Sequence, residues 1–336
     1  MNEAYMSFPD QDVVLRTGAT RRRNYRDLRF AGQMDDAGAA LLEQRAGQAL
    51  LASGQGFECE RLGDMDEAHK GQLAENGLVN RLDLQQAERT LLYLDPIGGV
   101  YVLLCGQEHL LIRTLQEGEN LERAVLCGRR QEELLGEQGE FAFDPQFGFL
   151  TSRAEDAGTG LCPWALLHLP LLAEEKLFPG LVREMREQGL TLAALEEGAG
   201  PLSRRFLLSS RSGFGLDEEE QVRVVREAAA QLTGCERELR ENARAKLPPA
   251  LFDRLCRAQA ILRSARLMSA KEMIQRLSDL RLGVCLGLFE GSLTRIDQLD
   301  RTLRPSGLKI RCGQASEQAQ NAARADALRA YMASLS

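Results

Sequence analysis

A Gly-Thr-Gly turn at Gly158, Thr159 and Gly160 is the stretch of this sequence whose residue types most directly suggest chemistry. Glycines let a backbone come close to a phosphate, whose oxygens the N–H groups of such a turn can bind. No lysine follows the turn, and the residue after Leu161 is Cys162. Similar turns are common without any ligand, so two interpretations stay open: a phosphate site, or a turn that the fold requires.

An arginine-rich run, RRRNYR at 21–26, could grip phosphates through paired hydrogen bonds. A run of like charges is more often a solvated face. Use of this run for nucleic-acid or phosphate binding would need a continuous basic surface. The net charge of −7 does not favour a nucleic-acid partner.

Two histidines and one carboxylate are the remaining candidates for acid–base chemistry. His109 and His168 lie inside apolar runs, which predicts core histidines, and no Ser/His/Asp or Cys/His pairing is legible. Glu197 follows Glu196 and precedes a glycine, so it is either a general base on a loop or part of a polar turn.

The eight cysteines form no C-x-x-C pair and lie in apolar company. This pattern predicts buried, reduced thiols and no metal cluster. The N-terminal residues lack the basic and apolar regions of a signal peptide, and no apolar run approaches the roughly 20 residues that span a bilayer. We therefore expect a soluble, cytoplasmic protein with no membrane partner.

The elements that must position these residues change character along the chain. The first part mixes strand-like runs with helical spacing, and Pro96 to Gly99 predicts a hairpin turn between the first two strands. The expected strands are 90–95, 99–106, 109–115 and 204–210, and the expected helices are 40–53 and 177–189.

From Asp217 onward the sequence predicts helices only. Asp217 with Glu220, and Ser269 with Glu272, have capping-box spacing. The acidic run after Asp217 is typical of a solvated helix N-terminus rather than of a metal site. A break at Leu247-Pro248-Pro249 divides the chain into residues 1–248 and a helical C-terminal domain, 249–336. The expected helices are 217–247, 269–283, 292–303 and 316–335.

Four collinear segments resemble the bacterial protein arginine kinases, within the guanidino (phosphagen) kinase superfamily. They are VVLRTGATRRRNYRDLRF, FGFLTSRAEDAGTGLCPWALLHLP, EEGAGPLSRRFLLSS and IQRLSDLRLGVCLGL. The resemblance implies an α+β fold: an antiparallel sheet flanked by helices and holding Mg-ATP, with a helical C-terminal domain that forms dimers. It also implies phosphoryl transfer from Mg-ATP to a guanidinium, catalysed mainly by positioning and charge neutralisation.

The sequence departs from this family where the chemistry would occur. Positions that carry phosphate-binding arginines in the family fall on Gly18, Thr20, Leu111, Cys162 and Leu192 here. The carboxylates that orient the guanidinium fall on Gly106 and Gln107, and the reactive cysteine falls on Arg153. The Arg-Asp pair that reads phosphoarginine in the C-terminal domain falls on Gln320 and Asn321.

Other family positions are retained or have arginines beside them. If a site persists, the resemblance gives catalytic roles to Glu197 and Arg153. It gives nucleotide contacts to Arg23, His109, Gly158, Thr159, Gly160, Arg204 and Arg211. The arginines beside lost positions are Arg16, Arg21, Arg22, Arg153, Arg204, Arg205 and Arg211.

Two functions follow from the resemblance. The first is a catalytically impaired relative that acts as a binding or regulatory subunit for protein partners, as a homodimer and without a cofactor. The alternative is an active protein arginine kinase that uses Mg-ATP in a rebuilt site. Losing about five charge-assisted hydrogen bonds, each worth roughly 1.5–3 kcal/mol, would lower nucleotide affinity by several powers of ten, which favours the first.

Overall fold

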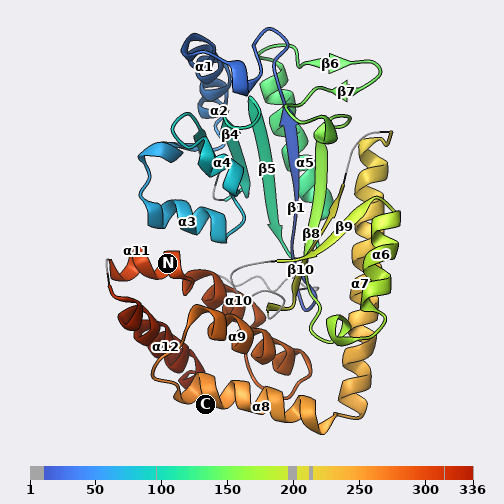
Figure 1. Ribbon diagram of the computed structural model, residues 1–336, viewed down its shortest axis with the longest axis vertical. Coiled ribbons are helices and arrows are strands. Elements are labelled where there is room, and N and C mark those ends of the chain that lie inside the picture. The colour runs from blue at the N-terminus through green and yellow to red at the C-terminus, as the bar shows by residue number, and fades with distance from the viewer. Residues whose placement is uncertain (1–10, 96, 196–202, 212–214, 314, 336) are drawn as a thin grey trace.

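The structure is a computed structural model that describes residues 11–95, 97–195, 203–211, 215–313 and 315–335. One eight-stranded sheet forms its centre, in the order β2-β3-β4-β5-β1-β8-β10-β9, with every neighbouring pair antiparallel (Figure 1). A separate hairpin pairs β6 with β7. The strands are β1 (Val14–Arg23), β2 (Glu58–Arg61), β3 (Leu91–Asp95), β4 (Val100–Leu104), β5 (Leu110–Glu117), β6 (Phe143–Asp144), β7 (Gly148–Phe149), β8 (Leu161–His168), β9 (Leu190–Ala194) and β10 (Arg205–Ser210).

Long helices cover one face of the sheet. Helix α5 packs on β1 and β5, α7 on β8 and β10, and α6 on β9. Their apolar sides bury a core that includes Val14, Leu167, Leu208 and Val225. The helices before residue 248 are α1 (Asp36–Leu42), α2 (Gln48–Ala52), α3 (Glu67–Glu75), α4 (Arg81–Gln85), α5 (Leu121–Gly136), α6 (Phe178–Glu187) and α7 (Glu218–Ala245). Shorter turns are η1 (Ala31–Gln33), the π-type η2 (Glu43–Gly47), η3 (Leu62–Asp64), η4 (Ala154–Asp156) and η5 (Leu172–Glu174).

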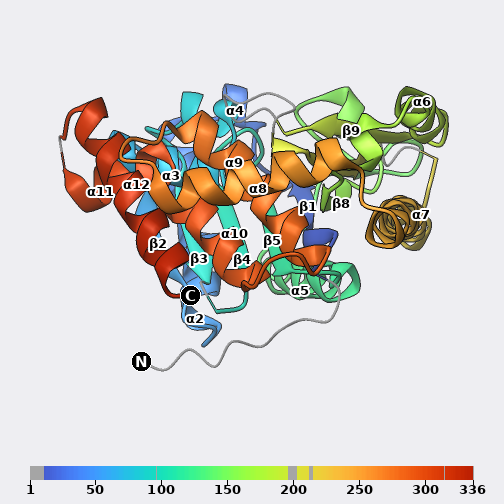
Figure 2. The ribbon, with the colours of Figure 1, turned by 90° about the horizontal axis from the view of Figure 1, so that it is seen from below.

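The C-terminal helices form a second layer below the sheet, as seen from below in Figure 2. They share their own apolar core, which includes Met273, Leu277, Leu299 and Leu328. Helix α11 packs against α3, so this layer also contacts the helices beside the sheet. The helices are α8 (Pro249–Ser264), α9 (Ala270–Cys285), α10 (Leu293–Thr302), α11 (Pro305–Cys312) and α12 (Glu317–Ala333).

The expected α+β fold is confirmed, and so are most of its local signals. The predicted hairpin exists as β3 and β4, with Leu92 paired to Leu103. Asp217 accepts a hydrogen bond from the Glu220 N–H at 2.7 Å, and Ser269 accepts one from the Glu272 N–H at 3.2 Å. Both helix N-termini therefore have the N-cap half of the predicted capping box, in which the N-cap side chain accepts from the backbone N–H three residues later.

Three expectations need correction. The helix expected at 40–53 begins at Asp36 and contains the wide turn η2, so it is two short helices joined by a π-type segment. The expected strands do not include β8, although its sequence LCPWALLH is almost entirely apolar. Buried thiols were expected throughout, but Cys59 and Cys312 are exposed.

Candidate functional site

The alternation of strand β1 sends the residues of the arginine run to opposite faces of the sheet. Arg21 and Arg23 point to the helix-covered face, where they are 1% and 0% exposed. Arg22 points to the other face and is only partly buried. The solvated, continuous basic face that could bind nucleic acid is therefore absent from this strand.

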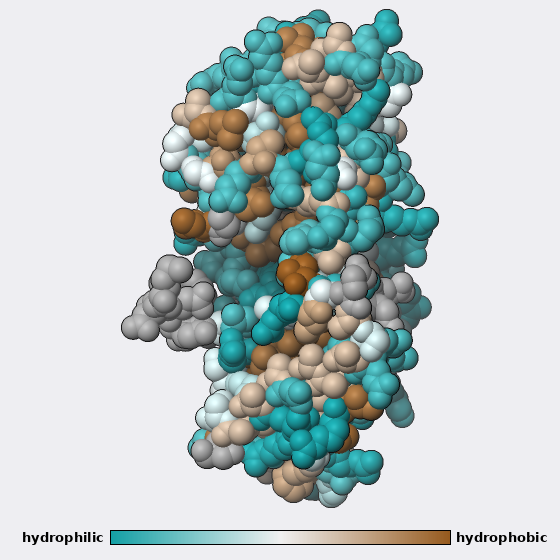
Figure 3. Space-filling model, turned by 90° about the vertical axis from the view of Figure 1, so that its left-hand side faces the viewer, coloured by the Kyte–Doolittle hydropathy of each residue, from teal (hydrophilic) through white to brown (hydrophobic). Residues whose placement is uncertain are grey.

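The face of the sheet opposite α5 and α7 borders a cavity of about 770 Å³. The C-terminal helices and the loop between α3 and α4 enclose it from the other side, and Figure 3 shows this side of the molecule hollowed between the two layers. Its apolar floor includes Tyr101, Leu115, Trp164, Leu166 and Leu207. Seven arginines line it: Arg16, Arg22, Arg81, Arg113, Arg205, Arg301 and Arg304.

Carboxylates of the chain itself already bind most of these arginines. Glu117 contacts Arg16 at 3.3 Å and Arg301 at 2.8 Å. Burial and the nearby Arg301 lower the pKa of Arg16 to about 10. A ligand at this end of the cavity would have to compete with Glu117 for both guanidinium groups.

A second carboxylate, Asp300, is fully buried between two more of the arginines. It lies 2.5 Å from Arg205 Nη1 and 2.7 Å from Arg304 Nη2. Burial alone would raise the pKa of Asp300, but the two guanidiniums outweigh it and lower this pKa to about 2. The charge of Asp300 is therefore kept, and both arginines are neutralised.

Two arginines are less engaged. The Arg22 side chain makes no hydrogen bond to a described residue, and its closest carboxylate is Asp156, 3.5 Å from Nε. The exposed Arg81 side chain has no partner within the described part of the chain. Arg113 donates to Asp83 at 2.8 Å and to the Leu78 carbonyl at 2.6 Å, both through Nη1.

The Gly-Thr-Gly turn lies on the helix-covered side and packs against Arg23. Arg23 donates from Nη1 to the Thr159 carbonyl at 2.9 Å and from Nε to Glu132 at 2.6 Å. Its guanidinium also lies 3.5 Å from the centre of the Phe149 ring. A Cβ at Gly160, whose φ is +61°, would come within 2.5 Å of Arg23 Nη1. The glycine thus makes room for a buried arginine.

His109 uses both ring nitrogens within the fold. Nδ1 accepts from the Tyr25 N–H at 2.9 Å, so Nε2 carries the proton and faces the Arg29 carbonyl at 2.7 Å. Burial lowers the pKa of His109, which keeps the ring neutral. These contacts fit the core-histidine interpretation, and they leave neither nitrogen for a nucleotide.

The other expected site residues do not converge. Arg153 is an exposed residue beside Glu155 and Asp156. Arg204 reaches Glu174 at 3.0 Å and Asp279 on α9 at 3.4 Å. Arg211 is exposed directly after β10. Glu197 lies outside the described residues.

By contrast, four of the positions where the family resemblance places a phosphate-binding arginine do share one face. Thr20 and Cys162 line the cavity and are paired across β1 and β8. Gly18 lies two residues before Thr20, and Leu111 two residues before Arg113, so both are on the same face. Leu192 instead belongs to the core beneath the helices. Ala193, paired with the cavity-lining Leu207, is the residue of β9 on the cavity face.

Bulky apolar groups now occupy the space at two of these positions. The ring of Trp164 lies so close to Gly18 that an added Cβ would come within 2.2 Å of it and of the Thr114 carbonyl. Leu111 is 3% exposed, in a cluster with Leu62 and Leu92. Neither position could hold an arginine that reaches the cavity without rearrangement.

Sequence reasoning named Arg16, Arg22 and Arg205 as neighbours of lost positions, but it missed Arg81, Arg113, Arg301 and Arg304. The last two come from the C-terminal helices, which only the tertiary structure brings to the sheet. Alternation along strand 109–115 could have placed Arg113 on the same face as Leu111, two residues earlier.

Comparison with known proteins agrees with this architecture. Residues 42–239 match the family described as "ATP:guanido phosphotransferase, C-terminal catalytic domain", and residues 248–336 match the "Protein-arginine kinase McsB C-terminal domain". The chain belongs to the ATP:guanido phosphotransferase family. A protein-arginine kinase from Exiguobacterium sp. is 32% identical over 82% of this chain and 80% of its own length. One from Caldanaerobacter subterraneus is 27% identical over 89% and 90%.

Solved structures share the fold at low identity. The crystal structure of lombricine kinase aligns with a TM-score of 0.61 and 16% identity, over 69% of this chain and 68% of its own. The substrate-free duplicated taurocyamine kinase from Schistosoma mansoni also has a TM-score of 0.61, over 80% of this chain and 40% of its own. These likenesses show the guanidino-kinase fold.

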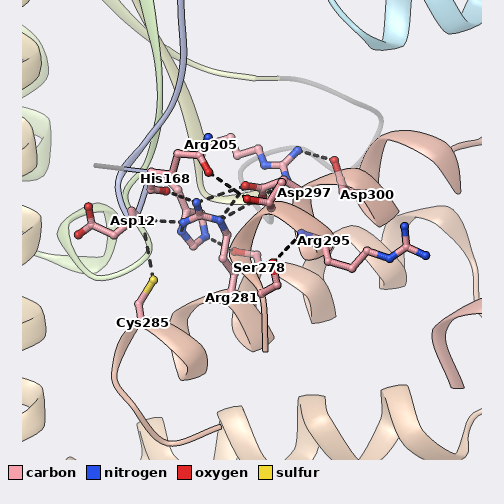
Figure 4. Close-up of polar contacts among 12 residues, drawn as sticks. Asp12, His168, Arg205, Ser278, Arg281, Cys285, Arg295, Asp297 and Asp300 are labelled. Carbon is pink, nitrogen blue, oxygen red and sulfur yellow. Dashed lines mark hydrogen bonds and ion pairs between the residues drawn. The ribbon is translucent and has the colours of Figure 1, made fainter. Parts of the chain in front are cut away.

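Two of the family-like segments meet where the sheet joins the C-terminal helices, shown in Figure 4. His168 at the end of β8 bonds through Nε2 to the Ser278 hydroxyl on α9 at 2.8 Å. Arg281 on α9 contacts Asp297 at 3.1 Å and donates to the Asp12 carbonyl at 2.6 Å. Burial, with Arg281 nearby, lowers the pKa of His168 well below its usual value. The segments HLP and LSDLRLG therefore hold the two layers together.

The family implies use of ATP, but the described cavity residues do not fit Mg-ATP well. Trp164 fills the space beside Gly18. The positions where the family resemblance places paired carboxylates carry Gly106 and Gln107, and Gln107 bonds to Asp83 at 3.1 Å. Over the described part of the chain, no group of three or more His, Cys, Asp or Glu residues is placed to hold a metal ion. No described helix is long and apolar enough to cross a membrane.

Proposed function

We propose that this chain is a catalytically impaired member of the protein-arginine kinase family that acts as a binding or regulatory subunit. The proposal depends chiefly on one observation: the cavity-facing positions Gly18, Thr20, Leu111 and Cys162 carry no cation where the family resemblance places phosphate-binding arginines. A nucleotide triphosphate brings several negative charges, and a site without matched cations binds it weakly.

The state of the remaining arginines supports the same conclusion. Five of the seven contact a carboxylate within 3.3 Å, through Glu117, Asp83 and Asp300. Rearranging a buried ion pair such as Arg205–Asp300 leaves an uncompensated charge, which costs about 3–5 kcal/mol. A triphosphate would therefore have to compete with carboxylates of the chain for these arginines.

An active protein arginine kinase with a rebuilt site is the second candidate, and the observation in its favour is the number of arginines around the cavity. In that case four residues would need to leave their present contacts or surroundings to touch a nucleotide: Arg23, His109, Arg204 and Arg211. The catalytic roles assigned to Arg153 and Glu197 stay predictions.

Calorimetric titration with Mg-ATP and Mg-ADP at low salt tests the proposal. We expect no saturable heat at millimolar nucleotide, and no acid-labile phosphoarginine after incubation with ATP and an arginine-rich protein. Micromolar binding, or transfer of labelled γ-phosphate to arginine, would establish the enzyme instead. An active protein-arginine kinase, such as that of Exiguobacterium sp., serves as the positive control for both assays.

The partners that this function needs are also part of the proposal. We expect a homodimer formed through the C-terminal helices, and protein partners that contain arginine or are regulated by the subunit. Sedimentation equilibrium of the whole chain tests the dimer: a mass of one chain, 37.2 kDa, at micromolar concentration would contradict it.

A further inference from the structure

Strands β1 and β5 carry two arginines directly opposite two positions where the family resemblance places an arginine. The register pairs Thr20 with Arg113 and Arg22 with Leu111. The family resemblance places arginines at 20 and 111, whereas this chain has them at 113 and 22. Each of these two cross-strand pairs thus keeps one arginine, carried by the opposite strand.

This exchange keeps positive charge in the same part of the cavity. Residues directly opposite each other in an antiparallel pair have Cβ atoms roughly 4.5–5.5 Å apart, and an arginine side chain is longer than that. Arg22 and Arg113 can therefore bring their guanidinium groups to the volume that the lost arginines would occupy. Charge repulsion between them agrees with this closeness, since Arg22 is among the groups that lower the pKa of Arg113, after burial as the main cause.

Both side chains have donors left for a ligand. Arg22 makes no hydrogen bond to a described residue. The bonds of Arg113 to Asp83 and Leu78 both use Nη1, so its Nε and Nη2 have no described partner. Arg81 lines the same cavity without a described partner. Arg22 and Arg81 differ from Arg16, Arg205, Arg301 and Arg304, whose carboxylate partners lie within 3.3 Å. Arg113 has such a partner in Asp83, but only through Nη1.

The rest of the cavity offers apolar surface instead of further cations. Trp164, opposite Gly18 on β8, lies four residues along the sheet from Arg22, roughly 13 Å at the rise of a strand. Leu166 and Leu207 continue the apolar floor. The volume of about 770 Å³ lies within the roughly 300–1,000 Å³ of small-molecule sites.

We propose that this cavity binds a small organic anion with a single phosphate or carboxylate group on an apolar, ring-containing body. The anionic group binds Arg22 and Arg113, assisted by Arg81, and the body lies against Trp164. The inference rests on the proposed function, because a cavity that took Mg-ATP would place a triphosphate over the same residues.

Calorimetry of the whole chain with 2-naphthyl phosphate tests the inference. Inorganic phosphate and 2-naphthol test each half of the ligand alone, and 2-naphthoate distinguishes a carboxylate from a phosphate. We expect 2-naphthyl phosphate or 2-naphthoate to bind at least tenfold more tightly than either half, and whichever of the two binds more tightly identifies the preferred anion.

Charge-removing variants locate the site. We expect Arg22→Gln to weaken binding by about 10- to 100-fold, since a charged hydrogen bond is worth roughly 1.5–3 kcal/mol, and Arg81→Gln to weaken it less. Arg26→Gln is the matched control, because Arg26 is three-quarters exposed and pairs only with Glu140 among described residues. Arg113 is left unchanged, because its loss would strand the buried Asp83.

Each outcome decides the matter. If Arg22→Gln and Arg26→Gln weaken binding equally, the binding is due to general electrostatics, which overturns the inference. If 2-naphthol binds as tightly as 2-naphthyl phosphate, the binding is due to apolar burial alone, which also overturns it. No binding of either anion overturns it too, while a parallel failure of Mg-ATP to bind leaves the proposed function standing. Saturable Mg-ATP binding would reject the proposed function itself.

Discussion

At the scale of single residues, Gly160 of the Gly-Thr-Gly turn makes room for a neighbouring side chain. Gly160 has a positive φ and lies against Arg23, which is fully buried under the Gly-Thr-Gly turn. A phosphate at this turn would meet Glu132 and Glu218, the carboxylates that pair with Arg23. The residue types that suggested a phosphate loop are thus explained by the space that a buried guanidinium needs.

We predict that Gly160→Ala destabilises the fold by about 1–3 kcal/mol, because alanine is strained at positive φ and its Cβ would meet Arg23 Nη1 at 2.5 Å. Urea unfolding measures the change. Gly180→Ala is the control: this glycine lies in α6 with no atom within 4 Å of an added Cβ, so alanine there should stabilise by up to about 1 kcal/mol. Equal effects of the two changes would contradict the role of Gly160.

Gly18 carries a second prediction, which concerns a position where the family resemblance places a phosphate-binding arginine. We expect Gly18→Arg to lower stability by at least about 1–3 kcal/mol without restoring nucleotide binding, because its Cβ would overlap Trp164 and the Thr114 carbonyl. Gly18→Arg combined with Trp164→Ala relieves only the first overlap, so it should remain less stable than the wild-type chain. Thermal unfolding and Mg-ATP calorimetry of both variants test this, and a stable, ATP-binding Gly18→Arg variant would refute it.

At the scale of elements, α9 joins the sheet to the C-terminal layer through buried polar groups. Arg281 is 1% exposed and contacts Asp297 of α10 as well as the backbone that leads into β1. Ser278, one turn earlier, bonds to His168. This dense set of contacts explains why the segment LSDLRLG carries so specific a sequence pattern.

We predict that Arg281→Met destabilises the protein by about 3–5 kcal/mol, because it removes a buried guanidinium that contacts Asp297 and donates to the Gln11 and Asp12 carbonyls. Asp297 then keeps only the 3.8 Å contact with Arg205 among its described ion pairs. Chemical denaturation followed by circular dichroism gives the change in unfolding free energy. Arg295→Met is the control, since Arg295 is exposed on α10 and bonds only to Gln298 and its own helix among described residues. Its effect should stay within about 0.5 kcal/mol.

The helices and strands also show which parts of the fold the sequence could predict. Hydrophobic alternation and caps placed β3, β4, β5 and β10 and the helices α6, α7, α9, α10 and α12, because those signals are local. The expected helices do not include α5 or α8. The same signals did not place β8, whose apolar residues run almost without interruption because one face packs beneath α7 and the other borders the apolar floor of the cavity. The cavity could not be predicted from the sequence, because it depends on the register of β1 with β5. It also depends on Arg301 and Arg304, which belong to a distant part of the chain.

At the scale of the whole molecule, arginines and carboxylates form buried ion pairs on both sides of the sheet. Arg21 and Arg23 pair with Glu132 and Glu218 beneath the helices, while Arg205 and Arg304 share Asp300 on the cavity side. In these pairs, arginine joins layers of the structure.

The buried histidines make the stability of the whole molecule depend on pH. The pKa of both His109 and His168 is lowered by burial, so the folded chain does not bind the proton that the unfolded chain takes up below about pH 6.5. Stability is therefore full above the unfolded pKa and falls as the pH drops below it. The predicted loss is up to about 1.4 kcal/mol per pH unit for each histidine.

Urea midpoints measured between pH 7 and pH 5 test this prediction in a range where most carboxylates stay ionised. His168→Gln should be less stable at pH 7 but should flatten the slope, because glutamine keeps a polar contact with Ser278 and does not titrate. His69→Gln is the control, since His69 is more than half exposed, and it should keep the slope of the wild-type chain. A wild-type midpoint that does not change over these two pH units would mean that the buried rings take up protons in the folded state, against the surrounding arginines.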